Sequence, residues 1–273
     1  YSQTLTSPEN WEDLEFNGDG YSQPVPTNPT AALQNVNFVS PDFEQPSVWK
    51  ANIAVDHELP YYGLVASAEL LVSQVETALF YQNLNLGAPT SILAQDGRDL
   101  FWNPTNAGKS WSSSNNRYNR NRSYDTVYLL DNTGKGESTQ FTLSLNKPWS
   151  TESDWSWYIA YTYTDATEVS GLTSSNASSG WNYNYLYNAN EEVAATSRYE
   201  ISDRFSGNLN WEHAFFGDYK TRVGLVYEGR SGRRYSWVYS NDVNGDGRSA
   251  NDLFYVPSGP GDVLFGTLSS SGV

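Results

Sequence analysis

Oxygen-bearing side chains occupy every second position of one short segment near the C-terminus, Asp242-Val243-Asn244-Gly245-Asp246-Gly247. This spacing resembles the first half of a calcium-binding loop, because Ca²⁺ is a hard cation that takes several oxygen ligands from one sharply turning segment. The candidate ligands are Asp242, Asn244, Asp246, the carbonyl of Arg248 and Asp252. The twelfth position is Leu253 where an EF-hand loop has a bidentate Glu, so the EF-hand pattern is incomplete.

The same segment also has an interpretation without a metal. Asp and Asn side chains accept hydrogen bonds from nearby backbone amides in Asx-turns, and Gly permits the positive φ that tight turns need. The run Asn17-Gly18-Asp19-Gly20 repeats the motif more weakly, and we interpret it as a turn. At residues 242–252 a calcium site and a metal-free turn both stay open.

Catalytic residues are not recognisable in the chain. His57 and His213 are the two histidines, and neither has a nucleophile at a familiar spacing. The neighbouring carboxylates Glu191 and Glu192 are of a kind common in an acidic chain and define no acid-base geometry. We therefore expect a protein that is not an enzyme.

Two groups of predicted loop residues are candidates for binding. Positive charge gathers at Lys109, Arg117, Arg120 and Arg122, which suit lipopolysaccharide phosphates or an anionic substrate, or pair with acidic loops nearby. Aromatic rings that suit sugars or peptides, or simply pack the loops together, are Trp102, Trp111, Trp181, Tyr183, Tyr185 and Tyr187. The sequence does not say which of them contact a substrate.

Composition narrows the class of protein. The 273 residues carry a formal net charge of −15, which disfavours nucleic acid as a partner, and the absence of Cys excludes disulfides and thiolate metal sites. The chain has 20 Tyr, 10 Trp and 11 Phe, yet no apolar run approaches the roughly 20 residues of a spanning helix. It begins at Tyr1 without an export signal, so we expect it to be processed or cut from a longer protein.

Three pairs of segments alternate strictly between apolar and polar residues, which predicts antiparallel strands. In residues 47–58, Trp49, Ala51, Ile53 and Val55 share one face and polar side chains take the other. The remaining alternating segments are 64–73, 141–147, 155–163, 204–212 and 219–228, and the short connections within pairs are 59–63, 148–154 and 216–218. Long connections near 83–136 and 165–197 separate the pairs.

Alternating short and long connections predict an all-β antiparallel transmembrane β-barrel, with short turns periplasmic and long loops extracellular. Residues 47–228 form the barrel strands in this prediction, and 1–46 and 229–273 are extracellular loop regions. About six spanning strands are too few to close a barrel, so we expect a partial barrel wall whose remainder lies elsewhere in the parent protein. Aromatic residues at the short turns suit an interfacial girdle: Tyr61, Tyr62, Trp149, Trp155, Phe215, Phe216 and Tyr219.

Residues 227–236, Tyr-Glu-Gly-Arg-Ser-Gly-Arg-Arg-Tyr-Ser, together with the 242–247 motif and Asn-Asp-Leu-Phe-Tyr-Val-Pro at 251–257, resemble Oar-like (OmpA-related) TonB-dependent receptors. Residues 45–52, 82–86 and 127–133 look like the barrel of the same family. One departure is Arg234, where the family's Gly-Arg-Pro-Tyr stretch has Pro.

The resemblance implies a receptor in the outer membrane of a Gram-negative bacterium, with a many-stranded barrel, a plug and a carboxypeptidase-regulatory-like domain. Such a receptor is driven by the TonB complex and lies among outer-membrane lipid and lipopolysaccharide. It also implies a large substrate, with a peptide or protein favoured. The sequence of this chain contains no recognisable plug or TonB-contacting segment. The alternative is a soluble or surface-attached β-rich module that binds glycans or proteins, with or without calcium.

Overall fold

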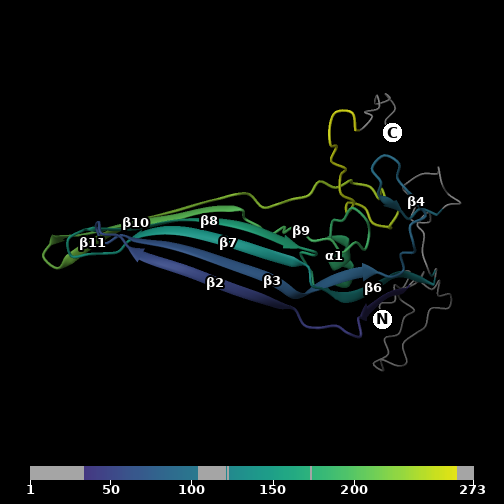
Figure 1. Ribbon diagram of the computed structural model, residues 1–273, viewed down its shortest axis with the longest axis horizontal. Coiled ribbons are helices and arrows are strands. Elements are labelled where there is room, and N and C mark those ends of the chain that lie inside the picture. Colours follow the sequence, from purple (N-terminus) through teal and green to yellow (C-terminus); the bar gives the residue numbers. More distant parts are fainter. Residues whose placement is uncertain (1–33, 104–120, 122, 173, 263–273) are drawn as a thin grey trace, which may run out of the picture.

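The computed structural model describes residues 34–103, 121, 123–172 and 174–262 (Figure 1). Within them the chain is all-β, with one short helix. In chain order the elements are β1 (Gln34–Val39), β2 (Ser47–Glu58), β3 (Val65–Asn83), β4 (Ser91–Ile92), β5 (Asp99–Leu100), β6 (Tyr124–Thr133), β7 (Gly136–Lys147), β8 (Trp155–Glu168), α1 (Ala177–Asn182), β9 (Ala195–Thr196), β10 (Asp203–Phe216) and β11 (Tyr219–Arg230). No helix among these residues is long and apolar enough to cross a membrane.

Three antiparallel hairpins, β2–β3, β7–β8 and β10–β11, form the sheet in the order β2-β3-β7-β8-β10-β11. Strict alternation predicted these pairs. Two of the hairpin turns use positive φ, at Tyr62 (57°) and Gly63 (62°) in one and at Gly217 (58°) in the other. Positive φ matches the turn to the twist of the strands, which is why short hairpins favour Gly there. All three turns lie at one end of the sheet, on the left of Figure 1.

Strand register joins the apolar positions of the hairpins into one continuous face. One row across the sheet, aligned residue by residue, is Val55, Ala68, Leu143, Tyr161 and Phe205. The adjacent row on the other face is Glu69, Thr142, Thr162 and Arg204. Because side chains alternate along every strand, this register gives the sheet an apolar side and a polar side.

The two faces differ in the contacts that their side chains make. The apolar face is open to its surroundings, with Ile53 66% exposed, Val55 62% and Leu225 65%. On the polar face side chains bond to one another across strands, as in the 3.1 Å hydrogen bond between the hydroxyls of Thr142 and Thr162. Cross-strand pairs of this kind stabilise the sheet from the polar side.

The sheet continues beyond the predicted hairpins through β1 and β6. The last part of β3 pairs with β6, and Ala78↔Thr133 and Gln74↔Glu137 keep a single register across the β6–β7 junction. β1 runs parallel to β6, with Phe38 opposite Leu129. The prediction of loops at 1–46 and 83–136 therefore differs from the structure, which has strands β1, β4, β5 and β6 there.

The elements β1, β4, β5, β6, α1 and β9 and residues 231–262 gather at the end opposite the tight turns, here called the loop end (Figure 1). The large buried apolar side chains belong to this end: Phe80, Leu86, Phe101, Tyr128 and Trp181. Asn176 caps α1 by accepting a 3.0 Å hydrogen bond from the amide of Ser178. The buried core thus lies in the loop end, whereas the apolar face of the sheet is uncovered.

Candidate functional site

The predicted ligand residues 242–252 form one compact turn inside the loop end. Asn244, Asp246 and Asp252 are almost completely buried, with 2%, 1% and 0% of their surface exposed. Asp242 accepts hydrogen bonds on both carboxylate oxygens, from the amide of Gly245 (2.7 Å) and the amide of Gly247 (2.9 Å). Sequence reasoning therefore selected residues that the fold does bring together.

Further side-chain to backbone bonds complete the turn. Asn244 Oδ1 accepts from the amide of Asp246 at 2.8 Å, and Asp246 Oδ1 accepts from the amide of Arg248 at 2.8 Å. Asp252 Oδ2 accepts from the amide of Val243, also at 2.8 Å. These are Asx-type bonds, in which short polar side chains replace the backbone partners that a tight turn lacks.

The carboxylates of this turn repel one another in a dry setting. Burial, together with the negative charges of Asp242 and Asp252, raises the pKa of Asp246 to about 7. Burial also raises the pKa of Asp252, against the opposing effects of the Val243 amide and the Arg98 guanidinium. Binding of a proton or of a cation lowers the electrostatic repulsion among these carboxylates.

Two observations bear on the metal prediction. Two buried oxygens beside the turn, Asn251 Oδ1 and Asp252 Oδ1, accept no hydrogen bond. Within the part of the chain that the structure describes, no group of three or more His, Cys, Asp or Glu is arranged to hold a metal ion. Calcium at this turn stays a prediction.

Arg98, which the sequence analysis did not select, ties the turn to the β4–β5 hairpin. Its Nε donates to Asp96 Oδ2 at 2.7 Å, and its Nη2 donates to the carbonyl of Leu253 at 2.6 Å. The guanidinium also lies over the rings of Tyr187 and Tyr239, 5.0 and 5.3 Å from their centroids. No local pattern marks this arginine, because two of its contacts are supplied by chain about 150 residues away.

Trp102 packs directly on the turn. Its indole Nε1 donates a 3.0 Å hydrogen bond to the carbonyl of Val243. Gly245, at φ 79°, lies so close that an added Cβ would approach the Trp102 ring to 2.7 Å. Of the predicted loop aromatics, Trp102 and Trp181 thus pack inside the loop end, and Trp181 is 4% exposed.

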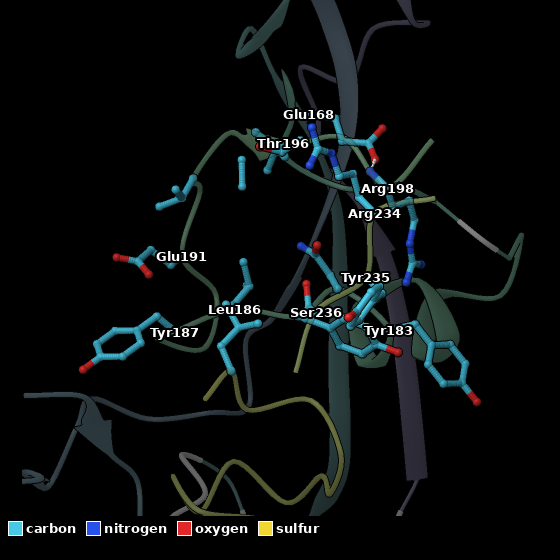
Figure 2. A pocket seen from close by; sticks show the side chains of 17 residues that line it. Glu168, Tyr183, Leu186, Tyr187, Glu191, Thr196, Arg198, Arg234, Tyr235 and Ser236 are labelled. Carbon is cyan, nitrogen blue, oxygen red and sulfur yellow. Dashed lines mark hydrogen bonds between the residues drawn. The ribbon is translucent and has the colours of Figure 1, made fainter. Parts of the chain in front are cut away.

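A pocket of about 380 Å³ lies beside the turn (Figure 2). Three predicted loop aromatics, Tyr183, Tyr185 and Tyr187, line it. Its walls come from residues 168–198, from residues 234–236 and from Leu253, which β8 and the chain after β11 bring together. The other candidates, Trp111, Lys109, Arg117, Arg120 and Arg122, lie outside the described residues.

Charged groups stand on two sides of this pocket. Arg234 donates to Glu200 Oε1 through Nε at 2.9 Å and through Nη2 at 2.7 Å. The Arg198 guanidinium lies over the Tyr185 ring, 5.4 Å from its centroid. Figure 2 shows Glu191 across the pocket from both arginines. The position that departs from the family pattern, Arg234, is therefore a wall residue with a buried carboxylate partner.

The histidines lie in the sheet, away from the pocket. His213 Nδ1 is 2.7 Å from Asp154 Oδ2, and the His213 ring stacks on Trp211 with centroids 5.8 Å apart. His57 is opposite Ala66 near the tight turn of the first hairpin.

Comparison with known proteins finds no relative of this chain. No family model matches the chain, and neither a curated protein nor a solved structure matches it.

Proposed function

We propose that the chain is a wall segment of a transmembrane β-barrel in the outer membrane of a Gram-negative bacterium. The carrying observation is the register that aligns apolar side chains across six strands into one exposed face. Rows of this kind turn apolar groups toward lipid and polar groups toward a lumen. A soluble sandwich instead covers such a face with a second sheet, whereas here Val55 and Leu225 stay more than 60% exposed.

Strand length supports this proposal. The strands β2, β7 and β11 have 12 residues each, and β8 and β10 have 14. A tilted strand needs roughly 9–11 residues to cross the hydrocarbon layer. Exposed aromatic rings mark the tight-turn end, where Tyr62 is 85% exposed, Phe216 79% and Tyr219 82%. Rings at this level suit the headgroup region of a bilayer.

The sheet edges point to further wall strands. Among the described residues, β2 pairs only with β3 and β11 pairs only with β10. In hydrocarbon an open edge would leave backbone donors and acceptors without partners, so a spanning sheet must close. We therefore propose that more strands of the same parent protein continue the wall on both sides.

The transport function rests on the resemblance to TonB-dependent receptors. In that assignment the loop end faces outward and captures a large substrate, with a peptide favoured, while the TonB complex energises its passage through other parts of the parent. Because β8 and β11 run from the tight turns toward this end, the residues that follow them and line the pocket lie there, as a capture site requires. The polar face of the sheet then lines the passage.

Single cysteines test the membrane assignment, because the chain contains no cysteine of its own. Leu143→Cys and Leu209→Cys place a label on the apolar face, and the neighbouring Thr142→Cys and Asn208→Cys place it on the polar face. With an environment-sensitive fluorophore in outer-membrane vesicles, we expect lipid-chain quenchers to quench labels at 143 and 209 but not at 142 and 208.

Equal quenching of the two faces would contradict the proposal. So would a parent protein that stays monodisperse in buffer without detergent, which is the behaviour of a soluble β-rich binding module.

A further inference from the structure

Arg198 presents an unused binding group in the pocket of Figure 2. The residue is half-buried, and its guanidinium carbon lies over the Tyr185 ring, 5.4 Å from the ring centroid. Its backbone amide donates to Glu168 Oε1 at 3.0 Å, whereas its side chain has no hydrogen bond or ion pair with any residue that the structure describes. The side chain is thus pre-positioned without an acceptor.

A guanidinium in this state favours an anionic ligand. It carries five N–H donors in a planar fork, and a side chain already held in one place loses less conformational entropy when these donors bind a ligand. A carboxylate satisfies two of them at once with matched geometry. The neighbouring Arg234 does not compete for this role, because its Nε and Nη2 already donate to Glu200.

The far wall of the pocket has the opposite charge. Glu191 Oε2 accepts only a 3.3 Å hydrogen bond from the amide of Asn188, and no Lys or Arg among the described residues forms an ion pair with Glu191. Tyr235 and Leu186 lie between the two charged walls (Figure 2). The two arginines therefore stand on one side of the pocket, with the Glu168 carboxylate beside Arg198 and Glu200 paired with Arg234, and Glu191 stands on the other side.

This arrangement selects among anions. A phosphate group carries up to two negative charges, which Glu168 and Glu191 on the same pocket disfavour. A peptide end supplies one carboxylate, an apolar or aromatic side chain and a cationic group within a short length. The volume of about 380 Å³ lies within the range of roughly 300–1,000 Å³ that small-ligand pockets occupy.

We propose that this pocket binds the C-terminal end of a peptide, with the terminal carboxylate on Arg198 and a cationic group of the peptide near Glu191. Peptide binding here would be the capture step of transport, so this inference rests on the proposed function. The last side chain of the peptide packs against Tyr235 and Leu186. Recognition of a free C-terminus explains why the arginine is stacked and half-buried yet has no partner.

The test uses the detergent-solubilised parent protein that contains this chain, and the synthetic tetrapeptide Lys-Ala-Ala-Phe as free acid and as C-terminal amide, measured by isothermal titration calorimetry. We expect the free acid to bind about 10- to 100-fold more tightly than the amide, which corresponds to one lost charge-assisted pair. Arg198→Gln should remove this preference. Arg233→Gln is the matched control, because Arg233 is an exposed arginine of the adjacent loop that does not line the pocket.

A second variant tests the other wall. Glu191→Gln should weaken binding of Lys-Ala-Ala-Phe but leave unchanged the affinity of acetyl-Ala-Ala-Ala-Phe, which lacks a cation. Equal affinity for acid and amide, an unchanged preference in Arg198→Gln, or no binding up to roughly 1 mM peptide would overturn the proposal. Displacement of the peptide by inorganic phosphate at similar concentration would also overturn it, in favour of a general anion site. The quenching pattern of the single cysteines reports the membrane assignment separately from all of these outcomes.

Discussion

Arg98 and Asp252 face each other in a fully buried position, with Arg98 Nη1 3.6 Å from Asp252 Oδ1 and neither side chain exposed. The pair joins the β4–β5 hairpin to the turn at 242–252. Buried charges of this kind are tolerated only where both partners are present, because desolvation of a single charge is expensive. The loop end is therefore one interlocked body and not a set of independent loops.

Arg98→Met is expected to loosen this body. The change leaves the Asp252 carboxylate buried without its cation, which costs about 3–5 kcal/mol in comparable pairs. Hydrogen exchange at the amides of Val243 and Gly245 measures this local opening. Lys135→Met is the control, because its pair with Glu192 is 53% and 38% exposed and should contribute less than about 1 kcal/mol. Equal effects of the two variants would show that Arg98 does not hold the turn.

Asp246 should make the turn sensitive to pH. Its pKa is about 7 in the folded protein, above the ordinary 3.8, so the folded state binds a proton more tightly than the unfolded state does. The free energy of opening should therefore fall as pH rises from about 4 to about 7, by about 4 kcal/mol, and stay level above that range. Hydrogen exchange of the Arg248 amide, followed in a buffer that contains a chelator, measures this free energy of opening.

Asp246→Asn should flatten this dependence, since the amide does not titrate. Asp262→Asn serves as the control, because the Tyr255 hydroxyl and the Ser258 backbone amide lower the pKa of that exposed carboxyl and place its titration below the window. A steep slope that survives in Asp246→Asn would assign the titration to another group.

Calcium is expected to slow exchange across residues 242–252. A cation offsets the mutual repulsion of Asp242, Asp246 and Asp252, and calcium at 100 times its dissociation constant stabilises a site by about 2.7 kcal/mol. The comparison is made with and without calcium in each protein, and Asp252→Asn should lose most of the difference. If calcium changes nothing in the unmodified chain, the hydrogen-bonded Asx-turn alone accounts for the motif.

Gly245→Ala is expected to displace Trp102. A Cβ at this position would lie 2.7 Å from the indole ring, and the φ of 79° disfavours any side chain. We expect a loss of about 1–3 kcal/mol in local stability, together with a red shift of tryptophan fluorescence. Gly259→Ala has no atom within 4 Å of its Cβ and should change neither quantity.

The hairpins were predictable because their information is local. Alternation along 47–58 and 219–228 fixes which side chains share a face, and Gly63 and Gly217 mark tight turns. The fold class all-β followed directly. The Asp242 to Asp252 cluster was also predictable, since its Asx bonds span only a few residues.

The remaining elements depend on distant partners. The sequence of β6 does not alternate strictly between apolar and polar residues, and its strand conformation is secured by β3 and by β1 on its two edges. Arg98 and the pocket around Arg198 are likewise assembled from separate segments. No spacing rule in a single sequence joins Arg98 to Asp252 or Arg234 to Glu200, because each contact exists only after the sheet has formed.

The parallel pairing of β1 with β6 also sets the order in which the chain folds. Phe38 and Leu129 are opposite each other although they are 91 positions apart, whereas Phe216 and Tyr219 close their hairpin within four residues. Closing a long loop costs more chain entropy and takes more time than closing a short one. The three hairpins should therefore form early, and β1 should dock late onto a β6 already held by β3.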